Sequence, residues 1–328
     1  MNQPTIVRAL RKAIKVEDAH SPYDTIHLKI FYQSEYSEAQ NPFSIAPAAR
    51  DLAPFPVVIF FNGFNCSFAV YEWLAAELTA RDLVVVLFDW LINANGVTTI
   101  TPGVDLTAFE RENYGKVPSA AALPLLSKEL DSLQSEGILA GLLNLNQIVL
   151  GGHSAGGRLA LENADPKFFD RLVGAFSYGA HSAAPISLKY EPGTILPLPD
   201  SLPMLLIGGT KDGVIAKNSK IYGVEQWSTP ATPVLRTFKE GFKFKDRNKC
   251  LVIIEGANHF AIADRTDPTL SVAADDFAAT KPEAEIRALM ASTIGLFIDA
   301  FILNRAQKSE FKKLLQVYDS AISLAEFQ

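Results

Sequence analysis

The sequence predicts an α/β protein with a mostly parallel central sheet of about eight strands, helices on both faces and an antiparallel edge near the N-terminus. Two observations lead to this. Continuous apolar runs bounded by turn residues recur along the chain, as is typical of strands buried on both faces. Segments of helical periodicity, such as residues 71–78 and 125–130, lie between them, and strands that alternate with helices build parallel sheets. With 328 residues and 48% hydrophobic content, a single domain over residues 1–328 can bury a sizeable core.

The first part of the chain predicts the antiparallel edge. Apolar and polar residues alternate from Thr25 to Tyr32, as on a half-buried strand. Residues 33–56 have no clear period and predict a surface loop. The six apolar runs that follow predict the buried strands, at residues 57–61, 83–88, 148–150, 172–176, 204–207 and 251–254.

Two stretches are longer than a simple crossover needs, residues 93–118 and 222–249. Long loops are often lids or binding loops, and plain surface insertion is the alternative. Near the C-terminus, apolar residues at helical spacing predict one helix from Ile286 to Phe301 and a second from Phe311 to Ile322. We expect both to cover the sheet, although the second could instead form a homodimer contact.

Composition excludes several classes of function. The net charge is −6 and the lysines and arginines are scattered, so the sequence has no basic cluster of the kind that binds nucleic acid. No apolar stretch reaches the roughly 18 residues of a membrane span, and the N-terminus lacks the layout of a secretory signal. We expect a cytoplasmic protein, although a processed mature form would look similar. Cys66 and Cys250 lack the spacing of a zinc site, so we expect two reduced, buried thiols and no metal or other cofactor.

The most informative motif is Gly152-His153-Ser154-Ala155-Gly156, which follows an apolar run and precedes a helical segment. This order of strand, sharp turn and helix is that of a nucleophile elbow. The serine must sit at a strained turn with its hydroxyl exposed, and glycines two residues away on either side avoid clashes there. We therefore predict Ser154 as a nucleophile.

A serine hydroxyl needs a base to take its proton, and the base needs a carboxylate to orient it. His259 follows the last apolar run on a glycine-containing loop and is the expected base. Asp212 follows the run at residues 204–207, which gives the chain order serine, aspartate, histidine. The alternatives for the acid are Asp170, Asp200 and Glu255.

An acyl-transfer site also needs amide donors for an oxyanion. The first is expected at Ala155, the residue after the nucleophile, and the second at Phe64, on the loop after the first parallel strand. Asn62 is the alternative to Phe64. Several aromatic residues near the predicted strand ends would suit an apolar substrate group, and core packing explains many aromatics equally well: Phe64, Phe68, Trp90, Tyr114, Tyr178 and Phe260.

Taken together, residues 62–64, 152–157, 209–212 and 256–260 resemble the corresponding motifs of the α/β-hydrolase superfamily. From about residue 23 to 303 the chain looks most like the dienelactone-hydrolase-like and cutinase (polyester hydrolase)-like esterases. It resembles chlorophyllases and platelet-activating-factor acetylhydrolases more distantly. The resemblance implies the α/β-hydrolase fold and a serine carboxylic-ester hydrolase, but not its substrate. From the aromatic residues we expect a small-molecule ester with an apolar group.

The implied roles are Ser154 as nucleophile, Asp212 and His259 as its partners, and the amides of Phe64 and Ala155 as oxyanion donors. The chain also departs from its relatives. Dienelactone hydrolases carry cysteine in the elbow, and chlorophyllases usually carry arginine where Ala155 stands. The alternatives are a chlorophyllase-like pigment esterase, an acyltransferase, and a catalytically silent binding protein on the same scaffold.

Overall fold

The computed structural model describes residues 6–17, 19–35, 45–94, 96–243, 248–265 and 271–328. Within these ranges ten strands form one sheet in the order β1-β2-β4-β3-β6-β7-β8-β9-β10, with β5 paired to β4. The strands are β1 Ile6–Lys15, β2 Thr25–Ser34, β3 Phe55–Phe61, β4 Val84–Ala94, β5 Val97–Thr101, β6 Leu143–His153, β7 Leu172–Tyr178, β8 Met204–Lys211, β9 Lys249–Asn258 and β10 Ile322–Phe327. The helices are α1 Glu72–Thr79, α2 Ala122–Ser135, α3 Ala155–Glu162, α4 Gly213–Lys217, α5 Thr232–Glu240, α6 Glu283–Phe297 and α7 Lys308–Val317.

The sheet is mixed, which corrects the prediction of about eight mostly parallel strands. The central pairs from β4 through β3, β6, β7 and β8 to β9 are parallel. Antiparallel pairs add β1, β2 and β5 on one side and β10 on the other. The two extra strands are short and lack an apolar run, because β5 reads VTTIT and β10 reads ISLAEF.

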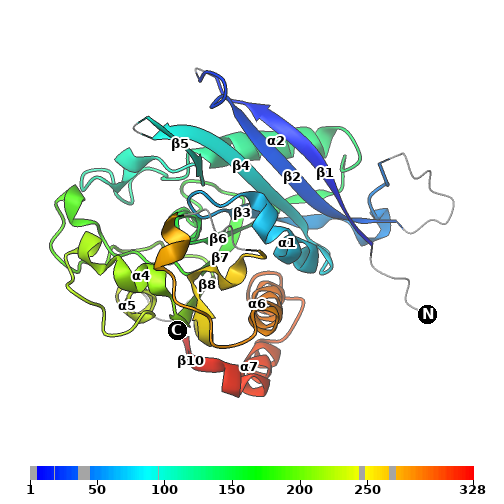
Figure 1. The fold of residues 1–328 in the computed structure, drawn as a ribbon. Helices are drawn as coiled ribbons and strands as arrows, with labels where there is room; N and C mark the ends of the chain where they lie inside the picture. Colours follow the sequence, from blue (N-terminus) through cyan, green and yellow to red (C-terminus); the bar gives the residue numbers. More distant parts are fainter. Residues whose placement is uncertain (1–5, 18, 36–44, 95, 244–247, 266–270) are drawn as a thin grey trace.

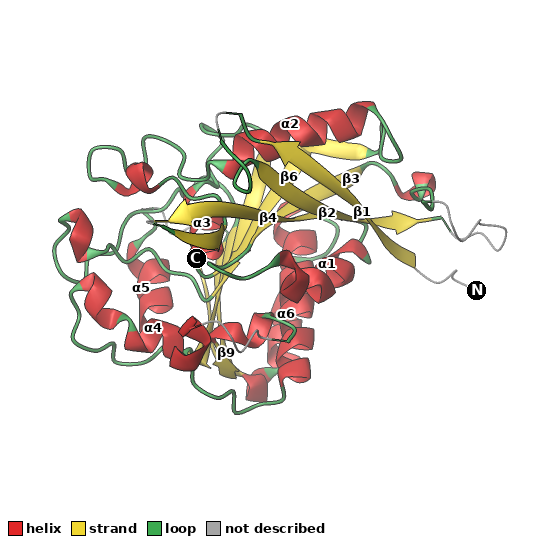
Figure 2. Ribbon diagram, turned by 45° about the horizontal axis from the view of Figure 1, so that its top comes forward, coloured by secondary structure: helices red, strands yellow, loops and turns green. Residues whose placement is uncertain are grey.

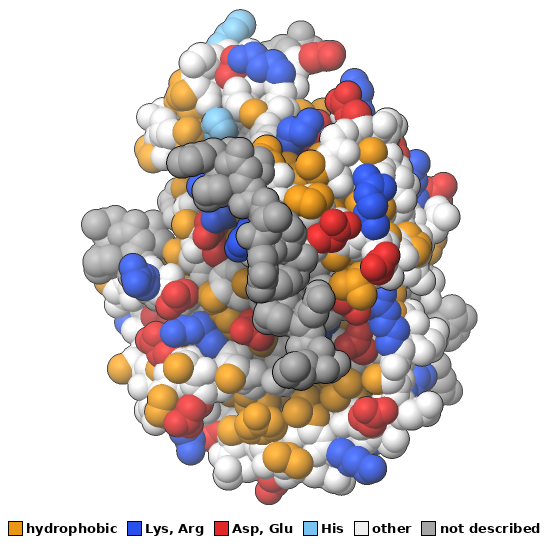
Figure 3. Space-filling view, turned by 90° about the vertical axis from the view of Figure 1, so that its right-hand side faces the viewer, with side chains coloured by type: hydrophobic (Ala, Val, Ile, Leu, Met, Phe, Trp, Pro, Cys, Tyr) orange, Lys and Arg blue, Asp and Glu red, His pale blue; other side chains and the backbone are white. Residues whose placement is uncertain are grey.

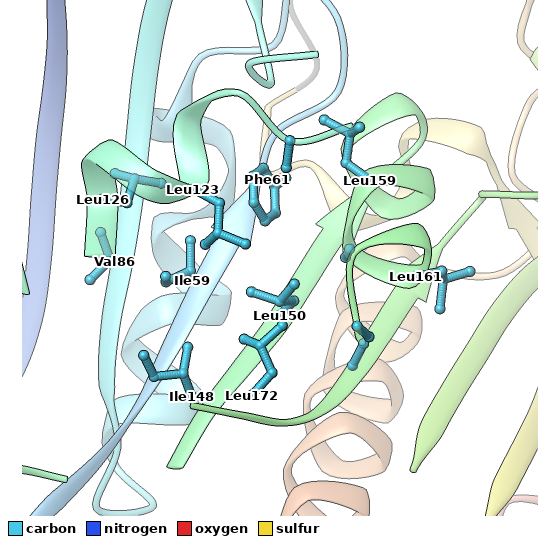
Figure 4. Close-up of a cluster of buried hydrophobic side chains, with 14 of the residues drawn as sticks. Ile59, Phe61, Val86, Leu123, Leu126, Ile148, Leu150, Leu159, Leu161 and Leu172 are labelled. Carbon is cyan, nitrogen blue, oxygen red and sulfur yellow. The ribbon is translucent and has the colours of Figure 1, made fainter. Parts of the chain in front are cut away.

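The sheet lies between two layers of helices (Figure 2). β3 is buried on both faces, so its alternate side chains enter different cores: Ile59 packs with α2 and α3, whereas Phe60 packs with α1 and α6. Figure 4 shows the first of these cores, where Ile59 and Phe61 lie among leucines of α2, α3 and β6. Burial of this kind dominates the stability of the fold.

The C-terminal part differs from the prediction of a helix that runs to Ile322. Helix α6 continues as a π-helical turn at Ile298–Ile302, and α7 ends at Val317. Ile322 instead begins β10, which pairs antiparallel with β9 and lies beside α7 at the end of the molecule away from the β1-β2 hairpin (Figure 1). The apolar side chains Phe311 and Leu315 of α7 are buried against α6 and its extension within the same chain. The alternative of a homodimer contact on this helix therefore gains no support.

The two long stretches, residues 93–118 and 222–249, contain secondary structure of their own. The first contains β5 and a 3₁₀ turn at Leu106–Phe109, and the second contains α5. Residues 244–247 of the second stretch lie outside the described residues.

One face of the molecule agrees with the scattered charges of the sequence. On the face in Figure 3, basic and acidic side chains are interspersed rather than segregated. No helix in the described part of the chain is long and apolar enough to cross a membrane.

Candidate active site

Ser154 occupies the sharp turn between β6 and α3. Its φ of 54° and ψ of −123° are strained for a residue with a side chain. A Cβ on Gly152 would lie 2.4 Å from the carbonyl carbon of Gly156, and a Cβ on Gly156 would lie 2.3 Å from the oxygen of Phe61. Both glycines are therefore required by close backbone contacts, and together they hold the turn that leaves Ser154 partly exposed.

Asp212 and His259 form a buried pair. Asp212 lies directly after β8, where its Oδ1 accepts a hydrogen bond from the Ile215 amide at 2.9 Å and so caps α4. His259 follows β9, and its Nδ1 lies 2.8 Å from the Asp212 Oδ2. A carboxylate accepts hydrogen bonds, so Nδ1 carries the proton and Nε2 is left to accept another.

The end of β7 brings Ser154 next to this pair. The Ser154 amide donates to the oxygen of Tyr178 at 2.9 Å. A Cβ built on the next residue, Gly179, would lie 3.1 Å from the His259 Nδ1 and 3.3 Å from the Asp212 Oδ2. Among the described residues no hydrogen bond joins the Ser154 hydroxyl to His259, and such contacts commonly tighten only when substrate binds.

The charges around His259 favour its protonated form. Burial alone would lower the pKa of this imidazole, but the charge and hydrogen bond of Asp212, together with the charge of Asp276, raise the pKa above its ordinary value of 6.5. The imidazolium that forms when His259 takes a proton is therefore stabilised.

His153, the residue before the serine, links two loops of the site. Its Nδ1 lies 2.9 Å from the Tyr71 hydroxyl, which in turn accepts a hydrogen bond from the Gly63 amide at 3.1 Å. Its Nε2 lies 2.9 Å from the backbone oxygen of His259, and can only donate to it. Burial holds the pKa of His153 well below its ordinary value, so the ring is neutral. The sequence motif marks the position of His153 but not this bridging role.

Ala155 and Phe64, the expected oxyanion donors, line the same cavity as Ser154. Ala155 is the first residue of α3, and the first amides of a helix have no partner within it. No hydrogen bond among the described residues uses the amide of Phe64. Asn62, the alternative to Phe64, is buried, and its side-chain nitrogen donates to the oxygen of Cys66. Asn62 therefore shapes the loop that presents the amide of Phe64.

A cavity of about 570 Å³ opens beside Ser154 and Ala155. Its wall is mainly apolar, and includes Phe64, Leu106, Phe109, Leu188, Ile221 and Tyr222. Both long stretches contribute, the first through Leu106 and Phe109 and the second through Tyr222.

Of the predicted pocket aromatics, Phe64 lines this cavity and the others lie elsewhere. Phe68, Tyr178 and Phe260 are buried in the core beneath the site, and the Tyr178 hydroxyl donates to the oxygen of Asn258. Trp90 packs against the other core, with its ring nitrogen bonded to the oxygen of Tyr23 at 3.0 Å. Proximity to a strand end in the sequence does not decide on which side of the sheet a ring lies.

The polar side chains that line the cavity include His181 and Arg158. The Ala183 amide donates to the Nδ1 of His181 at 3.2 Å, so Nε2 carries the ring proton. Burial, with the charges of Arg158 and His259, lowers the pKa of His181 to about 3. Arg158 is held by Glu162 and by the oxygen of Ala183, each at 2.8 Å. The cavity thus combines an apolar wall with a neutral histidine and a paired arginine.

Asp276 is the residue of this region that sequence reasoning missed. Its carboxylate accepts backbone hydrogen bonds from the loops that carry Asp212 and His259. No motif marks it, because its partners are amides that lie far away in the sequence.

Cys66 and Cys250 are buried thiols, and burial raises the pKa of Cys250. Within the described ranges, no group of three or more histidine, cysteine, aspartate or glutamate side chains is arranged to hold a metal ion.

The comparisons with known proteins concern the fold. A ferulic acid esterase from Streptomyces cinnamoneus, solved at 2.4 Å resolution, is similar over 92% of this chain and 91% of that chain, with a TM-score of 0.57 and 16% sequence identity. No family model matches the chain, and no curated protein matches it. At this identity the likeness shows that the chain shares the fold of that esterase, and it does not select among the branches that the motifs resemble.

Proposed function

We propose that this protein is a serine carboxylic-ester hydrolase that forms an acyl-enzyme on Ser154. The observation that supports this most directly is the buried hydrogen bond between Asp212 and His259 beside the strained elbow serine. A carboxylate, an imidazole with a defined tautomer and an exposed serine are the parts that nucleophilic acyl transfer needs.

The reaction would proceed in two halves. In the first, the Ser154 Oγ attacks the ester carbonyl carbon while the His259 Nε2 takes the hydroxyl proton. The amides of Phe64 and Ala155 would donate to the oxyanion of the tetrahedral intermediate. Collapse of the intermediate breaks the bond to the alcohol oxygen, which receives the proton from His259. In the second half, His259 takes a proton from water and the water oxygen attacks the acyl carbon. The bond between that carbon and the Ser154 Oγ then breaks, His259 returns its proton to the Oγ, and the acid is released.

The cavity favours an ester with an apolar group of moderate size. Its volume of about 570 Å³ falls within the range of small-molecule sites. Phe109, Leu106 and Tyr222 would surround the apolar group, while the neutral His181 offers a hydrogen-bond donor at the same wall. The likeness to a ferulic acid esterase makes aromatic-acid esters a second group to test.

The experiment is ester hydrolysis by wild type and Ser154→Ala. The substrates are p-nitrophenyl esters of increasing acyl length, methyl ferulate, a lactone and a chlorophyll. We expect wild type to cleave at least one simple ester and the variant to lose about 10³-fold or more in kcat. Equal rates for the two proteins would refute the proposal.

The alternatives give different results. An acyltransferase would form more transesterified product than acid when an alcohol is added at modest concentration. A silent binding protein on this scaffold would hydrolyse no ester and would not react with a fluorophosphonate, which labels only an activated serine.

A further inference from the structure

Asp276 lies outside the proposed triad, in the segment after the 3₁₀ helix Ser271–Asp275. Its Oδ1 accepts hydrogen bonds from the amides of Gly213 at 2.9 Å and His259 at 3.1 Å. Its Oδ2 accepts one from the amide of Phe260 at 3.1 Å. Gly213 directly follows Asp212, so one carboxylate ties together the loop after β8 and the loop after β9.

The backbone around these bonds is closely packed. A Cβ on Gly213 would lie 2.3 Å from the nitrogen of Phe277, so the loop after β8 lies directly against the segment that carries Asp276. The side-chain nitrogen of Asn258 donates to the oxygen of Phe277 at 2.8 Å. Both triad loops therefore contact the same short segment, and the Asp276 carboxylate makes contacts to each.

The charge of Asp276 also acts on the base. The groups that surround the His259 imidazole are the carboxylates Asp212 and Asp276, the neutral rings of His153 and His181, and the Tyr178 hydroxyl. Of these, Asp212 and Asp276 carry negative charge and favour the imidazolium. Burial raises the pKa of Asp276, while its hydrogen bonds from the three amides act in the opposite direction.

We propose that Asp276 is a positioning residue, whose carboxylate sets the backbone of the Asp212 and His259 loops and thereby holds the base in place for Ser154. The proposal rests on the hydrolase function proposed above. Asp276 does not line the cavity, so it acts through His259 and Asp212 rather than on the substrate. Small displacements of a catalytic group lower the rate sharply, so the loss of these bonds should be visible in kcat.

The test compares Asp276→Ala and Asp276→Asn with wild type. Alanine removes every acceptor, and asparagine keeps one oxygen but turns an NH₂ toward backbone amides that are themselves donors. The matched control is Asp275→Asn. Asp275 is a neighbouring carboxylate whose side chain is 51% exposed, and its ion pair with the Lys217 Nζ is long, at 4.0 Å. A fluorophosphonate titration counts the functional sites, so that kcat is expressed per labelled serine and unfolded protein does not contribute.

We expect kcat per site to fall about 10-fold or more in Asp276→Asn and about 10²-fold in Asp276→Ala, with KM changed less than about 3-fold. The acidic limb of the pH profile should also move to lower pH in both variants, because a charge that favours protonated His259 is removed. Asp275→Asn should match wild type in both measurements. If Asp276 only stabilised the fold, its replacement would leave the acidic limb of the pH–rate profile unchanged in the molecules that remain folded.

The proposal is overturned if both Asp276 variants keep the wild-type kcat per site and the wild-type limb while Asp212→Asn is crippled. It is also overturned if kcat per site falls and the limb stays in place. Failure of the proposed function looks different, because wild type itself would then show no hydrolysis that depends on Ser154.

Discussion

Asp212→Asn tests the assigned tautomer of His259, because the two oxygens of Asp212 have different partners. Oδ1 accepts from the Ile215 amide at 2.9 Å, and Oδ2 accepts from the His259 Nδ1 at 2.8 Å. An asparagine has only one oxygen, and the Ile215 amide can only donate. The oxygen should therefore stay with Ile215, and the NH₂ should face His259.

That arrangement reverses the tautomer of the histidine. Facing a donor, Nδ1 must become an acceptor, so the proton moves to Nε2 and the base can no longer take the serine proton. We expect kcat to fall by roughly 10²- to 10⁴-fold, which is about 3 to 5 kcal/mol of activation free energy. The cap on α4 survives, so the free energy of unfolding should change by less than about 2 kcal/mol.

The assay is p-nitrophenyl ester hydrolysis with separate kcat and KM, alongside thermal unfolding. The alternatives Asp170 and Asp200 supply the controls, because neither makes a contact with His259 within the described residues. Asp170→Asn and Asp200→Asn should be nearly neutral. The reasoning is refuted if Asp212→Asn keeps wild-type kcat, or if one of the two controls is the crippling change.

Three further predictions concern the histidines. Activity should rise with pH as His259 loses its proton, and because Asp212 and Asp276 raise the pKa of this ring, the midpoint should lie above 6.5; a rate that is flat from about pH 5 to 8 would contradict this. Because the pKa of His259 is raised in the folded state, its protonation stabilises the fold; this contribution is complete below pH 6.5 and is lost as pH rises through the folded-state pKa. The difference in thermal stability between wild type and His259→Gln should therefore be larger at acidic than at alkaline pH. His181→Gln should keep the wild-type pH profile, because burial keeps the pKa of His181 near 3 and the ring neutral throughout; a change of KM alone would agree with its place in the cavity wall, whereas a moved pH limb would not.

How much could be predicted depended on where each feature lies in the sequence. The parallel strands and the three proposed catalytic residues could be predicted because an apolar run ends a few residues before each of the three. β6, β8 and β9 then carry Ser154, Asp212 and His259 to the same edge of the sheet. The edge strands β5 and β10 were missed because an edge strand need not be apolar on both faces.

The remaining features depend on contacts between distant segments. Asp276 meets backbone amides of residues that share no pattern with it, and Leu106 and Tyr222 reach the cavity from loops without a period. Tyr178, the last residue of β7, is buried in the core although it stands at a strand end, because side chains of a strand alternate between the two faces. Phe68 is buried in the same core from the 3₁₀ helix Phe68–Tyr71, which no pattern in the sequence indicates.

The most direct test of the central claim is to label the protein with a fluorophosphonate and locate the adduct by peptide mass spectrometry. We predict one adduct, on the Ser154 hydroxyl, whose formation is abolished in Ser154→Ala and slowed in parallel with kcat in Asp212→Asn. Complete lack of labelling of a folded, ester-cleaving protein, or an adduct on another residue with Ser154 unmodified, would contradict the account.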